Sequence, residues 1–346
     1  MTAAGETYRA IRLERIAPSF REGCEIVDLP LRAPGPGEIQ VRNRWCGVNG
    51  IFDTQIARNS VDYVKITLPT FTGVEAIGEV TAVGEGITRF AVGDAVLTVR
   101  FTGGYREANT GPECDFVPAP ALAPEWLALA STGVSAMVAL EQIGELKEGE
   151  TVAISAAAGG LGHFLVQIAA HKGCRVIGVA GDPEKCAFVK SLGAERVIDY
   201  RREDVSAVLA AEYPRGLDVA VDTVSGTIFD AFLANIANHG RLVVGGAAAD
   251  LEGKPEIVTA PRIAHSIYYK GASIRGFMNG LLTQHWDDAR TRLFDMHARG
   301  LIRVHIDAQP NLGIAGVYGA VERLLSGKSI GKVLVDLAPQ AGPAQG

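Results

Sequence analysis

The stretch SAAAGGLGH, residues 155–163, places three glycines within four positions, directly after an apolar run. Backbone without side chains lets a phosphate approach closely, and the unpaired N–H groups at the start of a helix attract an anion. Apolar residues recur at helical spacing after the loop, which predicts that Gly159, Gly160 and Gly162 join a strand to a helix N-terminus. The stretch therefore predicts a pyrophosphate-binding loop, with a tight turn that serves packing alone as the alternative.

The end of the next expected strand carries the residues that would choose between NAD and NADP. A site for NAD usually has an acid there to bind the ribose 2′-hydroxyl, but this strand ends in Gly181. Asp182 follows just before Pro183, where an acid commonly caps a helix. Lys185 is close enough in sequence to meet a 2′-phosphate, and Tyr200 closes the third strand, where it could stack or hydrogen-bond nearby. These residues favour NADP over NAD, against the alternative that Lys185 is an ordinary surface residue.

These loops must be positioned by a series of elements that begins near residue 150. Apolar runs typical of buried strands alternate there with helical patterns, and such βαβ alternation predicts a parallel, doubly wound sheet. The expected strands are 151–155, 175–181, 196–200, 217–224 and 241–246, and the expected helices are 163–173, 183–193, 202–213 and 228–240. Before about residue 125, short alternating runs broken by turn residues indicate antiparallel β-structure.

Composition limits the partners of the chain. Its 346 residues are 47% hydrophobic and 21% charged, which allows a large core and two domains. A formal net charge of -6 without a dense Lys/Arg block disfavours nucleic acid and anionic membranes as partners. The longest uncharged run, Trp126 to Leu140, is too short to span a membrane. Charges near the N-terminus and five scattered cysteines without a CxxC pair fit a reducing compartment, so we expect a cytoplasmic protein.

Several motifs together resemble one protein family. AAAGGLG, GDPEK, LGAERVIDY and the closing GKSIGKVLV are similar to the medium-chain dehydrogenase/reductase superfamily, in its zinc-free quinone oxidoreductase and enone reductase branch. GVNGIFD and SIRGFMNG are most similar to prostaglandin reductases of the zinc-binding alcohol dehydrogenase domain type. The resemblance covers nearly the whole chain. It implies an α/β fold with a GroES-like β-rich catalytic domain (1–130 and 303–346), a Rossmann nucleotide-binding domain (131–302) and a homodimer.

Two turns depart from the zinc-dependent members of that superfamily. Those members hold their catalytic zinc on a cysteine in a GxCxxD-like turn and a histidine in a GHE-like turn. Here the turns read GVNGIFD and GVEA, with Asn49 and Val74 in the cysteine and histidine places. We therefore expect no metal, with Glu75 as a structural carboxylate and Cys46 as a small buried hydrophobe. None of the seven histidines has a partner at ligand spacing, so we expect them to be surface or structural residues.

The chemistry that the resemblance implies needs no metal. A hydride can be delivered to an electrophilic β-carbon if hydrogen-bond donors hold the conjugated carbonyl oxygen. We therefore expect an NADPH-dependent, zinc-independent reductase of α,β-unsaturated ketones, aldehydes or quinones, with 15-keto-prostaglandin-like substrates as the narrower hypothesis. The alternatives are a one-electron NADPH:quinone reductase and a non-catalytic NADPH-binding structural or regulatory protein.

The resemblance also assigns site residues position by position. Asn49 would face the nicotinamide, with a turn-capping role as the alternative. Tyr268 and Tyr269 are candidate substrate-facing donors, with half-buried aromatics as the alternative. Ser329 stands where relatives commonly carry asparagine, so its cofactor hydrogen bond is expected to be shorter-reaching or lost. The other implied cofactor contacts are Thr132 at the domain junction, Leu161 in the glycine loop, Thr223 after the fourth strand, and Phe277, Met278 and Asn279 beside the nicotinamide.

Overall fold

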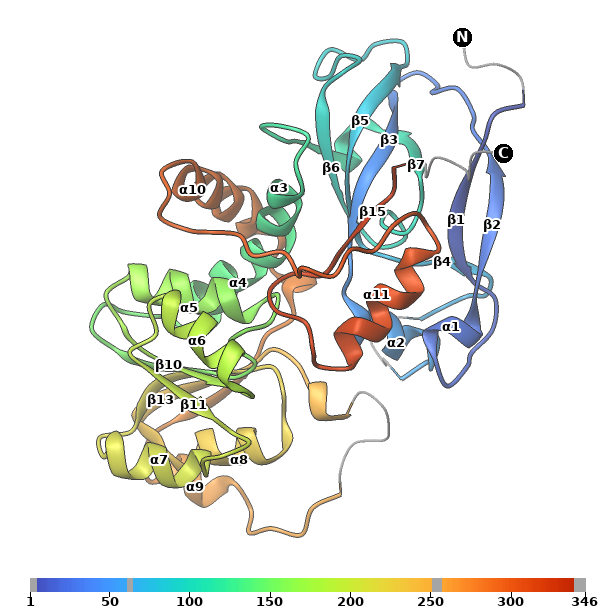
Figure 1. Cartoon of the computed structure of the whole chain (residues 1–346). Helices are drawn as coiled ribbons and strands as arrows, with labels where there is room; N and C mark the ends of the chain where they lie inside the picture. The colour runs from blue at the N-terminus through green and yellow to red at the C-terminus, as the bar shows by residue number, and fades with distance from the viewer. Residues whose placement is uncertain (1–4, 61–64, 251–256, 339–346) are drawn as a thin grey trace. The chain divides into compact units, whose positions relative to one another are not determined.

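The computed structural model describes residues 5–60, 65–250 and 257–338, and the chain forms two compact units (Figure 1). The first unit is Met1–Ser131 with Ile306–Gly346, and the second unit is Thr132–His305. These limits lie one residue and three residues from the ones that the resemblance implies. Each unit has its own β-structure and its own core, so each is described by itself.

The second unit is built on a six-stranded sheet in the order β11-β10-β9-β12-β13-β14. Every neighbouring pair in this sheet is parallel. Numbered from the first strand of the unit, the order is 3-2-1-4-5-6, that of a doubly wound dinucleotide-binding fold. The strands are β9 (Thr151–Ile154), β10 (Arg175–Ala180), β11 (Arg196–Asp199), β12 (Leu217–Asp222), β13 (Ile236–Val244) and β14 (Ser273–Gly276). The structure thus confirms the predicted parallel, doubly wound sheet.

Helices cover both faces of this sheet (Figure 1). The helices of this unit are α4 (Val134–Val138), α5 (Gly162–His171), α6 (Pro183–Ser191), α7 (Val205–Glu212), α8 (Gly226–Ala234), α9 (Ala264–Tyr268) and α10 (Trp286–Ala298). Helix α5 packs on β9 and β10, and α6 packs on β10 and β11. Helices α7 and α8 bury Leu209 and Phe232 against Ile177 and Leu242 of the sheet. The sheet is therefore buried on both sides, as its nearly continuous apolar strands require.

One expected helix of the second unit is too long. The helix expected over 228–240 ends at Ala234, and β13 already begins at Ile236. Asn235 ends the helix, because its side-chain amide donates to the Ala231 carbonyl at 2.8 Å. Beyond it, Gly240 lies so close to β12 that a Cβ there would be 2.7 Å from the Leu217 carbonyl oxygen. The extended pairing with β12 overrides the local helical pattern.

The first unit is antiparallel, as its alternating sequence predicts. One sheet has the order β2-β1-β4, and a second has the order β15-β3-β5-β6-β8 with β7 also paired to β3. The strands are β1 (Thr7–Leu13), β2 (Cys24–Pro30), β3 (Glu38–Gly47), β4 (Thr70–Phe71), β5 (Glu75–Val83), β6 (Ala95–Val99), β7 (Ala108–Pro112), β8 (Phe116–Pro118) and β15 (Leu334–Asp336). Because β15 pairs with β3, the C-terminal segment belongs to this unit.

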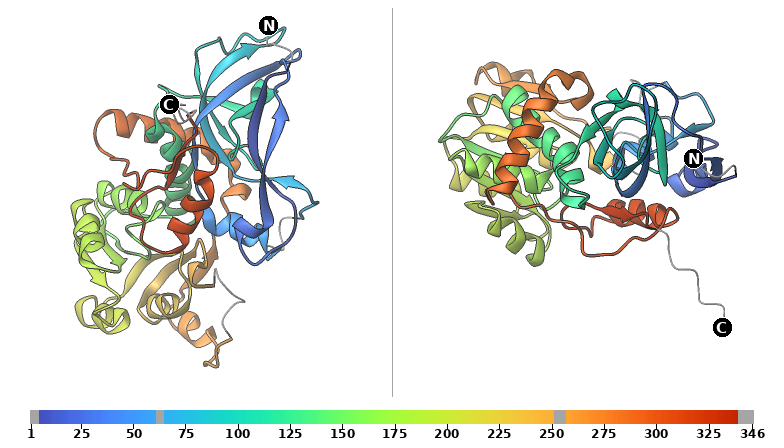
Figure 2. Two further views of the ribbon diagram at one scale, coloured as in Figure 1. Left: turned by 45° about the vertical axis from the view of Figure 1, so that its right-hand side comes forward. Right: turned by 90° about the horizontal axis from the view of Figure 1, so that it is seen from above.

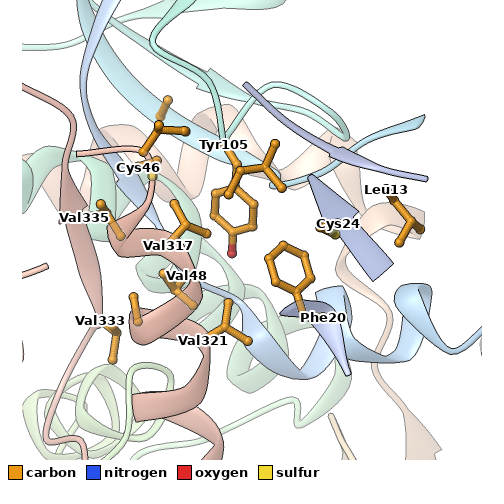
Figure 3. Packing of buried hydrophobic residues seen from close by; sticks show 14 of the residues in the cluster. Leu13, Phe20, Cys24, Cys46, Val48, Tyr105, Val317, Val321, Val333 and Val335 are labelled. Atoms are coloured by element: carbon orange, nitrogen blue, oxygen red, sulfur yellow. The ribbon is translucent and has the colours of Figure 1, made fainter. Parts of the chain in front are cut away.

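Short helices close the core of the first unit. They are α1 (Phe20–Gly23), α2 (Gly50–Ala57), α3 (Pro124–Ala128) and α11 (Gly316–Leu325), and α11 lies beside α2 in the views of Figures 1 and 2. Val317 and Val321 of α11 pack with Val48 and Phe20 in one apolar cluster (Figure 3). The ring of Tyr105 is buried in the same cluster. The N-terminal and C-terminal parts of the chain thus share this core.

The apolar run around Trp126–Leu140 forms part of a longer helical segment. Helical structure continues through two π-helical turns over the 20 residues from Pro124 to Ile143, and an 18-residue window of this segment has a mean hydropathy of 1.3. Length and composition alone would allow such a segment to cross a membrane, so the expectation that it is too short is wrong. Because 61% of the apolar window is buried inside the protein, the segment has the character of a core helix.

Candidate functional site

The predicted phosphate loop connects β9 to α5 in the second unit. Gly162 is the first residue of α5, and a Cβ at this position would lie 2.2 Å from the Ala156 carbonyl oxygen. At Gly159 a Cβ would lie 3.2 Å from the same atom, a much smaller conflict. Gly162 is therefore required by the turn itself. No side chain in the described part of the chain caps α5. The N–H groups of His163 and Phe164 donate to the carbonyls of Gly159 and Leu161 at 3.0 and 3.2 Å, so those of Leu161 and Gly162 are the ones suited to an anion.

This loop lies where the strand order of the sheet reverses direction. Strand β9 is flanked by β10 and β12, and the chain leaves β9 and β12 at the same edge. The Thr223 N–H donates to the Ser155 hydroxyl at 2.8 Å, which ties the two strand ends together. Asp222 accepts from the N–H groups of Val224 and Ser225 at 3.0 and 2.9 Å, so the loop after β12 is fixed as well. Ligands of doubly wound sheets bind at this switch point.

Asp182, the acidic residue that follows β10, has a structural role. Asp182 caps α6, because its carboxylate accepts from the Lys185 N–H at 2.9 Å. Gly181 lies against the ring of Tyr200, where a Cβ would be 2.5 Å from a ring carbon. Lys185 is half-buried in the first turn of α6. Its side chain is thus the cation nearest in sequence to the end of β10, while the Asp182 carboxylate is hydrogen-bonded to the backbone of α6.

The residues assigned to the nicotinamide side occupy different surroundings. Thr132 is buried, and its hydroxyl has no hydrogen-bond partner among the described residues. Phe277 follows β14 and donates its N–H to the Val244 carbonyl at 2.8 Å, while Met278 is partly exposed. The Asn279 amide donates to the Ser135 hydroxyl at 2.8 Å and accepts from the Trp286 indole at 2.9 Å. Asn279 is therefore a link between helices, and its contact with a cofactor stays a prediction.

The two candidate tyrosine donors lie at the end of α9. Tyr268 and Tyr269 are 76% and 77% exposed, and their rings meet edge to face with centroids 5.0 Å apart. The alternative that both are half-buried aromatics is wrong, because α9 presents them to solvent. A substrate-facing role for either hydroxyl stays a prediction.

The first unit holds a buried polar cluster around the GVN turn. Lys332 Nζ lies 2.5 Å from Glu75 Oε1, and the two side chains are 3% and 0% exposed. The same ammonium donates to the side-chain carbonyl of Asn49 at 3.1 Å and to the Val48 carbonyl at 3.2 Å. The Asn49 amide group completes the triangle by donating to Glu75 Oε1 at 2.9 Å. A Cβ at Gly47 would lie 2.0 Å from that oxygen, so only glycine leaves room for the carboxylate.

This cluster decides the local role of Asn49. The residue stands at the N-terminus of α2, yet its side chain makes no capping hydrogen bond. The turn-capping alternative is therefore wrong, since Glu75 and Lys332 engage the amide instead. A buried amide held on both its oxygen and its nitrogen has a fixed orientation. Contact between Asn49 and a nicotinamide stays a prediction.

A second buried pair lies beside the first. The Tyr105 hydroxyl donates to Asp53 Oδ2 at 2.5 Å, and both side chains are about 1% exposed. Burial raises the pKa of Asp53 to about 7, although the hydrogen bond from Tyr105 lowers it. Burial also raises the pKa of Tyr105 well above its ordinary value. Tyr105 belongs to the apolar cluster of Figure 3, and its partner Asp53 is a buried carboxyl with its proton affinity increased.

Cys46 and Ser329 complete the residues placed in the first unit. Cys46 is fully buried in β3, and burial raises the pKa of its thiol, which confirms the expected small hydrophobe. Ser329 is buried in the turn before β15, where the next N–H, that of Ile330, donates to Asp307 at 2.9 Å. Asp307 also pairs with Arg323 at 3.2 Å. The turn is thus held by internal contacts, and a bond from Ser329 to a cofactor stays a prediction.

Comparison with known proteins gives concordant results. The family described as "Zinc-binding dehydrogenase" matches residues 160–295, and "Alcohol dehydrogenase GroES-like domain" matches residues 35–121. Prostaglandin reductase-3 of Mus musculus is 35% identical over 97% of this chain and 91% of its own length. A probable quinone oxidoreductase of Leishmania amazonensis is 30% identical over 95% of this chain and 98% of its own. The structure of Escherichia coli quinone oxidoreductase complexed with NADPH is similar with a TM-score of 0.82 and 27% identity, covering 95% of this chain and 99% of that one.

The chain belongs to the medium-chain dehydrogenase/reductase superfamily, in its quinone oxidoreductase and prostaglandin reductase branch. The first unit contains its GroES-like domain, and the second contains its nucleotide-binding domain. The family and fold that the sequence motifs suggested are confirmed.

The zinc that gives the matched family its description does not fit the residues of this chain. Zinc needs thiolate, imidazole or carboxylate ligands. Among the described residues, no group of three or more His, Cys, Asp or Glu side chains is placed to hold a metal ion. Glu75, which follows Val74 in the GVEA turn, instead forms an ion pair with the ammonium of Lys332 at 2.5 Å. A second cation at this carboxylate would be repelled by the first.

The sequence analysis assigned no role to Lys332, Asp53 or Tyr105. Lys332 begins the apolar run KVLVDL, and a lysine inside a strand-like run is an available sign of a buried, paired cation. Asp53 lies in GVNGIFD itself, four residues after Asn49. Tyr105 has no such local sign, because its partner Asp53 lies 52 residues away.

Proposed function

We propose that this oxidoreductase is an NADPH-dependent, zinc-independent reductase that transfers hydride to α,β-unsaturated ketones, aldehydes or quinones. The observation that carries the proposal is the glycine loop that leads into α5, at the switch point of a 3-2-1-4-5-6 sheet. A relative of similar fold was solved with NADPH, and curated relatives are named prostaglandin reductase and quinone oxidoreductase. Together they support a reduced nicotinamide as the reductant.

The choice of NADPH over NADH rests on the end of β10. Asp182 is engaged by the α6 backbone, so it is poorly available to bind the 2′-hydroxyl that distinguishes NADH. Lys185, in the first turn of α6, would pair with a 2′-phosphate. The N–H groups at the start of α5 would bind the pyrophosphate, next to Gly159 and Leu161. When bound, NADPH supplies the hydride.

The proposed substrates follow from the absence of a metal ligand set. Lys332 neutralises Glu75 internally, so the negative charge that develops on a substrate oxygen must be stabilised by hydrogen-bond donors. Such donors suffice for a conjugated carbonyl, where the charge is spread over an enolate. Tyr268 and Tyr269 are proposed donors, because α9 presents both hydroxyls to solvent. The narrower proposal, 15-keto-prostaglandin-like substrates, is supported by the 35% identity to prostaglandin reductase-3.

Steady-state oxidation of NADPH tests the proposal directly. The purified protein is assayed with an alkenal, a cyclic enone, a 15-keto prostaglandin and a naphthoquinone, each with NADPH and with NADH. We expect alkene-selective turnover that prefers NADPH. If only the naphthoquinone is reduced, and electron paramagnetic resonance detects a semiquinone during its turnover, one-electron quinone reduction would be favoured. NADPH binding without turnover of any substrate would favour a structural or regulatory protein.

We further propose a cytoplasmic homodimer without nucleic-acid or membrane partners. The formal charge of -6 supports the absence of nucleic-acid and anionic-membrane partners, and the five free cysteines support the cytoplasm. The homodimer rests on the family resemblance. Light scattering after size-exclusion chromatography measures the mass directly, and a mass near that of one chain would contradict the dimer.

A further inference from the structure

His163 is a fully buried histidine in the first turn of α5, immediately after the glycine loop. Its Nδ1 lies 3.0 Å from the carbonyl oxygen of Gly159, which is inside the loop. A carbonyl oxygen only accepts, so Nδ1 carries the proton and donates to it. The same oxygen also accepts from the His163 backbone N–H at 3.0 Å, so the ring is a second donor that restrains the peptide plane after Gly159 and the direction of the neighbouring N–H.

The other ring nitrogen of His163 faces a different segment of the second unit. The His305 backbone N–H donates to His163 Nε2 at 3.4 Å. A backbone N–H can only donate, so Nε2 accepts and the imidazole is neutral. The two contacts therefore require one tautomer, with the proton on Nδ1. One ring connects the glycine loop to a residue 142 positions away in sequence.

Gln167 strengthens the same connection one turn further along α5. Its side-chain amide donates to the Arg303 carbonyl at 2.9 Å, and its oxygen accepts from the Arg303 N–H at 2.8 Å. The amide also donates to the His163 carbonyl at 2.9 Å. Phe188 of α6 packs on the His305 ring with centroids 4.5 Å apart. Both α5 and α6 thus contact residues 303–305. These residues are the last of the second unit before the chain enters Ile306–Gly346.

We propose that His163 is a positioning residue for the cofactor and that it couples the glycine loop to segment 303–305. This proposal rests on the proposed function, because it assumes that the loop binds the NADPH pyrophosphate. The Nδ1–H bond to Gly159 adds to the backbone bond from the His163 N–H in orienting the loop N–H groups. Attachment of the segment depends on the Nε2 bond to His305 and on the two bonds between Gln167 and Arg303.

Two substitutions separate the two contacts of the ring. His163→Asn places an amide N–H near the position of Nδ1 but leaves nothing at Nε2. His163→Gln places an oxygen near the position of Nε2 but removes the donor to Gly159. His171→Asn, at the exposed end of the same helix, is the matched control. Circular dichroism and thermal melting verify that each protein is folded before it is compared.

Two measurements are made on each full-length protein: the dissociation constant of NADPH by fluorescence titration, and hydrogen exchange of the Arg303 and His305 amides without cofactor. For His163→Gln we expect NADPH affinity to fall about tenfold, the equivalent of one hydrogen bond of about 1.4 kcal/mol, with exchange at His305 nearly unchanged. For His163→Asn we expect NADPH affinity within about twofold of the native value and exchange at His305 at least about tenfold faster.

The outcomes distinguish the proposal from the function on which it rests. If the native protein binds NADPH but both variants bind it equally well, His163 does not position the loop. If exchange at His305 is the same in all proteins, the coupling to segment 303–305 is absent. If the native protein binds no NADPH, the proposed function and the positioning role both fail, while the exchange data still decide the coupling.

Discussion

Lys332 Nζ lies 2.5 Å from Glu75 Oε1, and the two side chains are almost completely buried in the first unit. Asn49 bonds to both of them, so the GVN turn, β5 and the segment just before β15 meet at one internal ion pair. In zinc-dependent members a metal ion would supply the positive charge near this turn. Here a side chain of the chain itself supplies it, which gives the unit a cation that chelators cannot remove.

Removing the cation should destabilise the protein strongly. We expect Lys332→Met to lower the free energy of unfolding by about 3–5 kcal/mol, because Glu75 would be left as a buried, unpaired charge. Urea denaturation followed by circular dichroism measures the change. The double variant Glu75→Gln with Lys332→Met should recover much of the loss, since neither charge remains. Additive losses in the double variant would contradict coupling between the two residues.

The buried carboxyl of Asp53 should make stability depend on pH. Its pKa is raised to about 7 in the folded state from 3.8, so the folded protein binds more protons between these values. Its contribution is complete below about pH 4 and is lost as pH rises through 7, a change of up to about 4 kcal/mol. In Asp53→Asn, a neutral isostere, this part of the pH dependence should vanish. Urea midpoints at pH 5 and pH 8 measure the difference between the two proteins.

The hydroxyl of Tyr105 should lower the proton affinity of Asp53. Tyr105→Phe removes the donor to Asp53 Oδ2, so the pKa of Asp53 should rise in this variant. The pH range over which stability is lost should then lie higher than in the native protein. We also expect a loss of about 1–3 kcal/mol near neutral pH, because a buried acceptor loses its partner. Urea denaturation at several pH values measures both effects. A pH profile identical to that of the native protein would show that the bond does not control Asp53.

The glycines of the loop should differ sharply in their tolerance of a side chain. Gly162→Ala puts a Cβ 2.2 Å from the Ala156 carbonyl oxygen, so the loop must shift, and we expect NADPH affinity to fall at least about tenfold. Gly159→Ala is the matched control, because its Cβ would lie 3.2 Å from the same atom. Fluorescence titration and thermal melting measure binding and stability. Equal effects of the two substitutions would show that the steric conflict at Gly162 is unimportant.

Lys185 should act on NADPH and leave NADH unaffected. We expect Lys185→Ala to weaken NADPH binding about 10-fold to 100-fold, the range of one charge-assisted contact, and to change NADH binding less than about twofold. Lys147→Ala removes an exposed lysine elsewhere in the second unit and serves as the control. Dissociation constants for both cofactors measure the ratio. An equal loss for NADPH and NADH would place Lys185 away from the 2′-phosphate.

The sequence was informative wherever local chemistry and chain direction decide the outcome. The βαβ series predicted the parallel sheet, because buried strands and amphipathic helices have different periods. Asp182 before Pro183 predicted the helix cap that is present. The same local reasoning extended α8 too far, because the pairing of Ile236 with β12 depends on a strand distant in sequence.

The sequence by itself therefore determined the fold class, the glycine loop, the missing zinc ligands and the family resemblance, since each depends on residue types at short spacing. Tertiary structure decided the partners of the buried polar groups. Asn49 meets Lys332 across 283 positions, and His163 meets His305 across 142. No local pattern fixes such pairs, because a buried charge or imidazole takes whichever complementary group the fold brings within hydrogen-bonding distance.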